Sequence, residues 1–282
     1  MFGSTIDYRI LRPLTHNRRL ETETELNARF SQYAAIDMNA AEARLLKLQD
    51  RLQDRLPIQT NLTYLDIGCG MGDITLALAR LGAGHVTGLD LVPRYTSAAI
   101  ANARLLGLAD KAEFVCHDVH DWTPPRRFDV VLSHEALEHI HDPKGFLARL
   151  DALVAPDGIV VLAFGPLFPS PFGDHMDAFF RAPIPWRGVL FSEEAVLRLR
   201  RERYRPTDQA ARYSEIVGGL NLLSYSDFLR HVEETGWTFD FLAVNPQLVR
   251  FPLLARISNS LIRLPRIRDY IASSVYAILR RA

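Results

Sequence analysis

This 282-residue chain contains a glycine-rich turn, Asp66-Ile67-Gly68-Cys69-Gly70-Met71-Gly72, which restricts the folds that the chain can adopt. It follows an apolar run that predicts a β-strand over 62–67 and precedes an Ala/Leu-rich run that predicts a helix over 74–81. Glycines let the backbone approach a ligand closely, and a helix N-terminus presents unpaired N–H groups. A strand, a glycine turn and a helix in this order are typical of a nucleotide-binding site.

Predicted strands and helices alternate on both sides of this turn. Strands are predicted over residues 62–67, 85–89, 112–116, 128–133 and 159–164, and helices over 74–81, 94–106 and 143–154. A turn is expected at Pro156-Asp157-Gly158. This alternation predicts an α/β fold of parallel strands joined by crossover helices.

The flanking segments predict further elements outside this core. Helices are expected over residues 23–33, over 39–56 with Pro57 as the stop, over 192–204 with Ser192 as N-cap and over 226–235 before Gly236, and strands over 237–244 and 274–279. The proposed domains are an N-terminal helical lid over 1–58, a ligand-binding core over 59–165, a substrate or lid insertion over 166–225 and a C-terminal completion of the sheet over 226–282.

Composition narrows the class of protein. A hydrophobic content of 48% is enough for a sizeable core, and a net charge of zero argues against attraction of the whole surface to nucleic acid. Two cysteines, Cys69 and Cys116, cannot make a disulfide framework and suggest a reducing compartment. Neither a signal-peptide pattern nor a run of 18 apolar residues is visible, so a cytoplasmic location is expected.

Acidic residues follow two of the predicted strands, where ligands bind in open parallel sheets. Asp90 comes 18 residues after Gly72 and can accept two hydrogen bonds from a ribose diol. Asp118 can accept from an adenine amino group, with Val119 covering the ring. The alternatives are a solvated acid at the start of a helix for Asp90 and an ordinary turn residue for Asp118.

Together these segments resemble class I S-adenosylmethionine (SAM)-dependent methyltransferases. The turn reads D-x-G-x-G-x-G, whereas dinucleotide-binding folds have G-x-G-x-x-G. Further residues carry the resemblance: Asp90, Asp118, Phe128-Asp129-Val130-Val131, Ala136-Leu137-Glu138-His139-Ile140 and Ala155-Pro156-Asp157-Gly158. The resemblance implies a Rossmann-like, seven-stranded, mostly parallel sheet with an antiparallel last strand. The cofactor-binding residues that it implies are Asp66, Gly68, Gly70, Gly72, Asp90, Leu91, Asp118, Val119 and Ser133.

Within this superfamily the chain is similar to the small-molecule branch that includes ubiquinone-type O-methyltransferases. Amino-group and DNA-base methylation is associated with Asn-Pro-Pro-Tyr after the fourth strand, where this chain has Leu132-Ser133-His134-Glu135. The expected reaction is therefore methylation of a hydroxyl on a phenol, catechol, sugar or lipid-linked precursor. The alternatives are a metal-dependent RNA ribose 2′-O-methyltransferase and a SAM-binding protein without catalytic activity.

A second motif, Glu135-Ala136-Leu137-Glu138-His139, suggests a divalent metal. On a helix, Glu135, Glu138 and His139 would share one side, and His175 can complete a site for Mg²⁺, Mn²⁺ or Zn²⁺. Similar motifs bind metal in small-RNA 2′-O-methyltransferases and some ubiquinone-pathway enzymes. In the alternative without metal, Glu138 and His139 cap the helix or hold the loop. The general-base candidates are then His134, His139 and His175.

The C-terminal segment has a distinct charge pattern. Residues 248–282 hold seven arginines and one acid, Asp269, and the arginines alternate with Leu, Ile and Phe as far as residue 271. This pattern is compatible with a weak peripheral membrane contact. The favoured interpretation is instead a pair of helices packed on the edge of the sheet.

Overall fold

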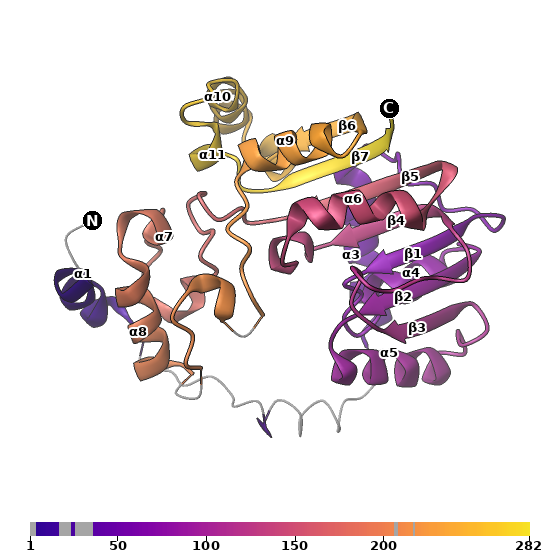
Figure 1. The fold of residues 1–282 in the computed structure, drawn as a ribbon, viewed down its shortest axis with the longest axis horizontal. Coiled ribbons are helices and arrows are strands. Elements are labelled where there is room, and N and C mark those ends of the chain that lie inside the picture. Colours follow the sequence, from indigo (N-terminus) through magenta and orange to yellow (C-terminus); the bar gives the residue numbers. More distant parts are fainter. Residues whose placement is uncertain (1–3, 17–23, 26–35, 206–207, 217) are drawn as a thin grey trace.

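A computed structural model describes residues 4–16, 24–25, 36–205, 208–216 and 218–282 of the chain. The described residues form one seven-stranded sheet with the order β3-β2-β1-β4-β5-β7-β6 (Figure 1). The strands are β1 (Thr63–Ile67), β2 (His85–Asp90), β3 (Ala112–Cys116), β4 (Phe128–His134), β5 (Val154–Phe164), β6 (Trp237–Val244) and β7 (Val275–Arg281).

Strand pairing confirms the predicted fold class. Strands β1 to β5 pair in parallel, whereas β7 is antiparallel to both of its neighbours, β5 and β6. The register aligns Ile67 with Leu89, and Asp90 with Cys116. The carboxyl ends of β1, β2 and β3 therefore lie side by side, which brings the loops that follow them to one edge of the sheet.

Helices cover both faces of the sheet and build a separate outer part. The α-helices are α1 (Ser4–Leu11), α3 (Met38–Arg51), α4 (Asp73–Arg80), α5 (Pro93–Leu105), α6 (Pro143–Leu153), α7 (Arg187–Leu190), α8 (Glu193–Arg203), α9 (Tyr225–Glu234), α10 (Pro252–Ile262) and α11 (Arg268–Ile271). The 3₁₀ helices are η1 (Arg12–Leu14), η2 (Leu137–His139), η3 (Asp177–Phe179), η4 (Tyr213–Glu215) and η5 (Pro246–Arg250). Within the described ranges, no helix combines the length and apolar character needed to cross a bilayer.

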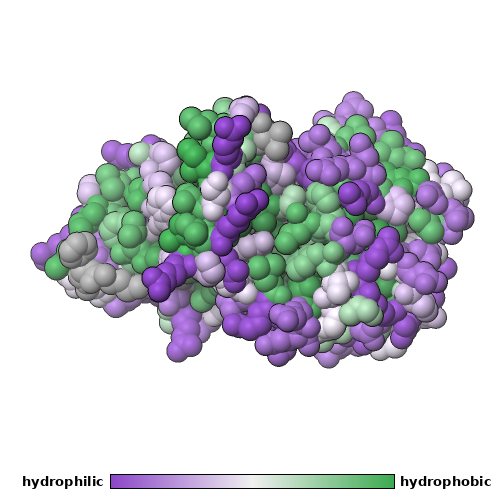
Figure 2. Space-filling model, turned by 90° about the horizontal axis from the view of Figure 1, so that it is seen from above, coloured by the Kyte–Doolittle hydropathy of each residue, from purple (hydrophilic) through white to green (hydrophobic). Residues whose placement is uncertain are grey.

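The outer part consists of the segment after β5 together with the N-terminal helix. Helix α1 packs on α8, and a hydrophobic cluster that includes Leu11, Phe180 and Leu199 joins them. A buried ion pair adds to this unit, since the Arg187 guanidinium donates to both carboxylate oxygens of Asp174 at 2.7 and 2.6 Å. Seen from above, the sheet and the outer part form a molecule longer than it is wide (Figure 2). The domain boundaries proposed from the sequence, at residues 58, 165 and 225, stay a prediction.

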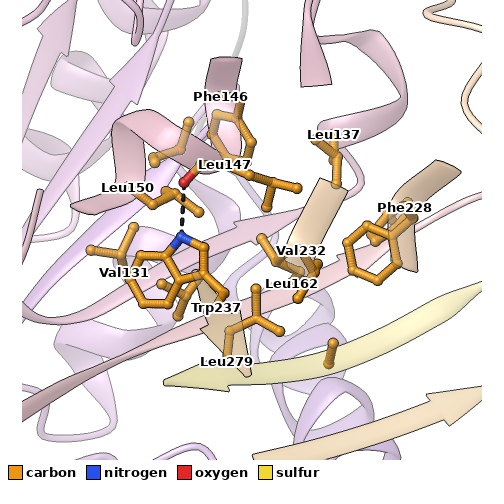
Figure 3. Packing of buried hydrophobic residues seen from close by; sticks show 14 of the residues in the cluster. Val131, Leu137, Phe146, Leu147, Leu150, Leu162, Phe228, Val232, Trp237 and Leu279 are labelled. Carbon is orange, nitrogen blue, oxygen red and sulfur yellow. Dashed lines mark hydrogen bonds between the residues drawn. The ribbon is translucent and has the colours of Figure 1, made fainter. Parts of the chain in front are cut away.

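One hydrophobic core lies between the sheet and helices α6 and α9. Trp237 of β6 packs there beside Leu147 and Leu150 of α6, and its indole N–H donates to the Leu147 carbonyl at 2.9 Å (Figure 3). A second core fills the other face, where Leu45 and Leu48 of α3 pack in one cluster with α4. Burial on both faces explains why the central strands are apolar.

The prediction that a helix runs to Leu56 is wrong. Helix α3 ends at Arg51, because Gln53 and Asp54 adopt positive φ angles of 53° and 56°. The Gln49 side chain stabilises this end by donating to the Leu56 carbonyl and accepting from the Leu56 N–H. The helix expected over 23–33 lies outside the described residues, apart from two helical positions, 24 and 25.

The start of the fifth strand also differs from the prediction. Strand β5 begins at Val154 rather than after a turn at 156–158, because Val154 already pairs with Phe128. The pairing then shifts register before Val130 meets Ile159. Pro156-Asp157-Gly158 therefore forms an irregularity within the strand pair instead of a turn before it. The other predicted strands and helices of the core are confirmed to within two residues of their ends.

Candidate active site

The glycine turn after β1 is held against the end of β2. The backbone N–H groups of Gly68 and Cys69 both donate to the Leu89 carbonyl, at 2.8 and 3.2 Å. The φ angles of Gly68 and Gly70 are 77° and 54°, and residues other than glycine rarely adopt such positive values. A Cβ on Gly68 would lie 2.4 Å from the Ala136 Cβ, whereas a Cβ on Gly70 would meet no atom within 4 Å. Gly68 therefore permits close packing, and Gly70 leaves open space.

A cavity of about 640 Å³ opens at this edge of the sheet. Eight of the residues proposed from the sequence line it: Gly68, Gly70, Asp90, Leu91, Asp118, Val119, Glu135 and His139. They come from the last residue of β2 and from the segments that follow β1, β2, β3 and β4, which the parallel sheet brings together. The volume lies within the range of small-molecule and cofactor sites, roughly 300–1,000 Å³.

Asp90 connects the glycine turn to the cavity. Its carboxylate accepts from the Gly70 N–H at 2.9 Å and from the Val92 N–H at 2.8 Å, one bond on each oxygen. A carboxylate has about four acceptor positions, so two remain for a ligand. The backbone bonds fix the direction of the carboxylate before any ligand arrives.

Asp118 is held in the same way by its own loop. Its carboxylate accepts from the His120 N–H at 2.9 Å, and Val119 between them is buried. Tyr95, His117 and His120 also line the cavity, although we did not single them out from the sequence. The signal that could have identified them is closeness in sequence to the two acids, because Tyr95 lies in the first turn of α5, five residues after Asp90, and His117 and His120 lie beside Asp118 in the loop after β3.

The rest of the cavity wall comes from residues distant in sequence. Ile216, Gly218 and Gly219, from the segment after η4, line the cavity together with Ile140 and His141. No local sequence pattern marks these residues, because they reach the cavity through tertiary packing.

Six of the proposed site residues do not line the cavity: Asp66, Gly72, Ser133, His134, Glu138 and His175. Asp66 is buried and accepts from the Thr75 hydroxyl at 2.6 Å, and burial raises the pKa of its carboxyl to about 7. A Cβ on Gly72 would lie 2.9 Å from the Phe114 ring, so this glycine allows a strand and a helix to pack closely. Both residues therefore support the turn without lining the cavity.

The expectation of a helix carrying Glu135, Glu138 and His139 is wrong. Glu135 has a positive φ of 54°, and only Leu137–His139 are helical, as the 3₁₀ helix η2. The i, i+3, i+4 spacing of an α-helix therefore does not apply. Asn221 braces this short element by donating from its side chain to the carbonyls of Leu137 and Ile140.

The residues of η2 make contacts of their own. A Glu138 carboxylate oxygen accepts from the Gly165 N–H at 3.3 Å, and a His139 ring nitrogen lies 2.8 Å from the Gly219 carbonyl oxygen. These contacts match the alternative in which Glu138 and His139 hold a loop. The second carboxylate oxygen of Glu138 is buried and has no hydrogen-bond partner among the described residues, and burial raises the pKa of this group.

The three candidate histidines lie in different surroundings. His139 lines the cavity, and its ring is 5.3 Å from that of His175 in an edge-on arrangement. His175 bonds to the Pro166 carbonyl at 3.1 Å, and burial lowers the pKa of its imidazole. Burial also lowers the pKa of His134, and the nearby cations Arg44 and Lys47 of α3 add to the effect.

The described residues do not bring three His, Cys, Asp or Glu side chains together in a metal-binding group. The His139 and His175 rings are neighbours, whereas the left-handed backbone of Glu135 departs from the α-helix on which the expected metal site depended. The donor set expected from the sequence is thus incomplete in this conformation.

Comparisons with known proteins agree with this geometry. Residues 65–158 match a protein family described as "Methyltransferase domain". Over this stretch the chain is similar to SAM-dependent methyltransferases. It is 39% identical over 118 residues to a ubiquinone biosynthesis O-methyltransferase of Rhodopseudomonas palustris (strain HaA2), which covers 40% of this chain and 44% of the relative. It is 38% identical over 103 residues to the mitochondrial ubiquinone biosynthesis O-methyltransferase of Arabidopsis thaliana, covering 36% of this chain and 32% of the relative.

The chain thus spans less than half the length of these curated relatives. Solved structures share the fold of the methyltransferase domain at low identity. The [4+2]-cyclase SpnF has a TM-score of 0.55 at 16% identity, covering 99% of this chain and 95% of that one. A SAM-dependent methyltransferase from Mesorhizobium loti has a TM-score of 0.52 at 18% identity, covering 83% and 98%. These likenesses confirm the fold that the sequence predicted.

Proposed function

We propose that this protein is a SAM-dependent methyltransferase that methylates a hydroxyl group of a small molecule. The observation that carries the proposal is the Gly70–Asp90 contact, which joins the glycine turn to a carboxylate that lines the cavity. The names of the ubiquinone O-methyltransferase relatives support oxygen as the acceptor atom. They leave the substrate open, because the match covers less than half of each relative.

The residues present fit the cofactor. The open space beside Gly70 can receive the amino-acid end of SAM, since no atom lies within 4 Å of a Cβ built there. Asp90 has acceptor positions left for the ribose hydroxyls, and Asp118 for the adenine amino group. When bound, SAM supplies a methyl group on a positively charged sulfur, which an oxygen nucleophile can attack.

On the acceptor side, we assign the general-base role to His139. One of its ring nitrogens lies 2.8 Å from the Gly219 carbonyl oxygen, and a neutral imidazole bonds there by donating its N–H. The other ring nitrogen is then an acceptor and can take the proton of a substrate hydroxyl. Ile140 and Ile216 add apolar surface to the cavity, which favours exclusion of water from the reacting oxygen.

Assistance by a divalent metal is a less supported part of the same proposal. In its favour, His139 and His175 each use one ring nitrogen on a backbone carbonyl, an arrangement that orients a metal-binding imidazole. Against it, the described residues form no group of three ligands. Elemental analysis of purified protein and activity after chelation decide this point. One bound ion per chain, together with loss of turnover on chelation, would establish that a divalent metal assists the reaction.

Two other functions are weaker alternatives. RNA ribose methylation needs a cationic channel for phosphates, and the net charge of zero gives little support to one. SAM binding without catalysis remains the alternative from another class, because binding residues alone do not create turnover. Tight SAM binding with no product from any acceptor would favour that alternative.

The product of the reaction provides the direct test. We expect the protein to convert SAM to S-adenosylhomocysteine in the presence of a hydroxyl-bearing acceptor from a panel of catechols, phenols, sugars and lipid-linked sugars. Mass spectrometry of the acceptor should show one added methyl group on oxygen. Methylation of nitrogen or carbon, with hydroxyl acceptors left untouched, would contradict the proposal.

A further inference from the structure

The helices α10 and α11, inserted between β6 and β7, project from the end of the sheet (Figure 1). Only one side of α10 is attached to the body. Ser258 is buried there, with its hydroxyl 3.0 Å from the Asn245 side-chain nitrogen, and Ile262 packs against the hydrophobic core. The Asp269 carboxylate of α11 accepts from the Ser226 N–H at 2.7 Å. These contacts fix which side of α10 faces outward.

The outward side of α10 is apolar. Leu253, Leu254 and Ile257 share one side of the helix at i, i+1, i+4 spacing, and they are 69%, 53% and 47% exposed. Phe251 before the helix and Leu264 after it are 53% and 52% exposed. Of the sixteen large hydrophobic residues that are exposed in the described part of the chain, six lie between 251 and 270. Such a concentration marks an interaction surface rather than scattered exposure.

The same segment is strongly cationic. Arg250, Arg256, Arg263 and Arg266 are all exposed, and among the described residues none of them pairs with an acidic group. The arginines of β7 differ, since Arg280 pairs with Asp240 at 3.6 Å and Arg281 with Asp151 at 2.7 Å. We call the five exposed apolar residues and these four arginines the α10–α11 surface: Phe251, Leu253, Leu254, Ile257, Leu264, Arg250, Arg256, Arg263 and Arg266.

Charge and shape together identify the partner. We propose that the α10–α11 surface binds an anionic lipid bilayer, with the leucines in the interface and the arginines at the lipid phosphates. Arginines beside an exposed apolar helix face are typical of helices that lie in a membrane surface. Helix α10 has 11 residues and is about 16 Å long, roughly half the thickness of the hydrocarbon layer, so it lies along the surface.

A second copy of the chain fits this surface poorly. In a symmetric dimer the same patch would meet itself, which would set four unpaired arginines of one subunit against four of the other. A peptide partner also fits poorly, because the apolar side of α10 is convex. The cavity beside α10 is lined by Ala255 and Asn259, which lie on the other side of the helix. Figure 2, seen from the side on which α10 projects, shows hydrophobic and hydrophilic residues next to one another.

Vesicle flotation with the full chain tests the proposal. One set of vesicles contains phosphatidylcholine alone, and the other contains equal parts of phosphatidylcholine and phosphatidylglycerol. We expect the protein to float with the anionic vesicles only, and to be released as salt is raised. Failure to bind anionic vesicles, or equal binding to both compositions, would overturn the proposal.

Variants locate the contact on the chain. Leu253→Ser with Ile257→Ser should weaken binding to anionic vesicles at least roughly tenfold. Arg256→Ala with Arg263→Ala should weaken it by roughly fivefold per arginine. Leu105→Ser is the matched control, because Leu105 is 68% exposed on α5, outside this surface, and its replacement should leave binding unchanged.

Circular dichroism of each variant measures whether it is folded, and sedimentation measures whether it self-associates. Native spectra establish that weaker binding does not come from unfolding, since all the replaced side chains are exposed. If the α10–α11 variants float as well as the Leu105→Ser control, the assignment is wrong. It is equally wrong if these variants abolish self-association of the chain and leave vesicle binding intact, because the partner is then a second copy. The outcome does not depend on methyltransferase activity.

Discussion

The two sides of the cavity are built in different ways. On the cofactor side, the carboxylates of Asp90 and Asp118 are held by backbone N–H groups two residues further along the chain. On the acceptor side, His139 is held by the carbonyl of Gly219, 80 residues away. Local sequence therefore fixes the cofactor side, and tertiary packing fixes the acceptor side. The first can be recognised from a motif, whereas the second depends on how a long insertion folds.

This difference implies that the two sides can be disabled separately. Changes on the acceptor side should affect turnover and leave SAM affinity intact. Changes on the cofactor side should lower SAM affinity directly.

His139→Asn should lower kcat by roughly 10²–10⁴-fold, the usual contribution of a general base. Asparagine can still donate to the Gly219 carbonyl but cannot accept a proton, so the loop should keep its structure. SAM affinity measured by calorimetry should stay within a factor of about 3 of that of the unaltered protein. A variant with full turnover would remove His139 from the reaction, and a large loss of SAM affinity would show that the two sides are coupled.

Asp66→Asn should remove a pH dependence of stability from the cofactor side. Burial raises the pKa of the Asp66 carboxyl to about 7 in the folded state, above roughly 3.9 in the unfolded chain. The folded state therefore favours the protonated form, and its stabilising contribution is present below about pH 4 and lost as pH rises towards 7. From pH 5 to pH 8, the unaltered protein should lose about 2–3 kcal/mol of unfolding free energy relative to the variant.

Urea unfolding of both proteins at the two pH values measures this difference. The other titratable groups contribute about equally to the unfolding free energies of the two proteins, so the difference between the proteins reports on Asp66. An offset between the two proteins that is the same at pH 5 and pH 8 would show that Asp66 ionises normally in the folded state.

Asp90→Ala should weaken SAM binding by about 2 kcal/mol, or roughly thirtyfold, because it removes charge-assisted hydrogen bonds to the ribose. It also frees the Gly70 N–H, so the turn loses an anchor. Calorimetric titration measures the dissociation constant of SAM, and thermal unfolding checks that the variant is folded. Unchanged affinity would refute the assignment of Asp90 to the ribose.

Gly70→Ala and Gly107→Ala form a matched pair with the smallest expected effect on stability. Both glycines have positive φ angles, 54° and 67°, and a Cβ on either meets no atom within 4 Å. Each replacement should therefore cost about 1 kcal/mol of stability from backbone strain. Only Gly70 lines the cavity, so only Gly70→Ala should also lower SAM affinity. Equal SAM affinities for the two variants would place the cofactor elsewhere.

The sequence predicted most of the sheet because its signals are local. Apolar runs bounded by glycine or acidic residues identified β1 to β4, and strand alternation implied the parallel topology. The ends of α3 and the start of β5 were wrong for tertiary reasons. Left-handed residues at Gln53 and Asp54 end one element, and pairing of Val154 with Phe128 extends the other.

The site was predictable only in part. Asp90 and Asp118 could be predicted because one is the last residue of β2 and the other follows β3 by two residues. The arrangement around Glu135 did not follow, because its positive φ turns the chain where an α-helix was expected. Ile216 and Gly219 gave no local signal, since an irregular segment carries them to the cavity. The basic C-terminal segment forms a pair of helices, as expected. The exposed apolar side of α10 supports the membrane contact that the sequence pattern also allowed.

SAM binding by the purified chain can be measured by calorimetric titration, and both the proposed reaction and the roles of the turn depend on it. We expect saturable binding of one SAM per chain at micromolar concentration, which Asp90→Ala should largely abolish and His139→Asn should leave intact. No heat of binding from SAM, or equal affinity in the Asp90→Ala variant, would contradict this expectation.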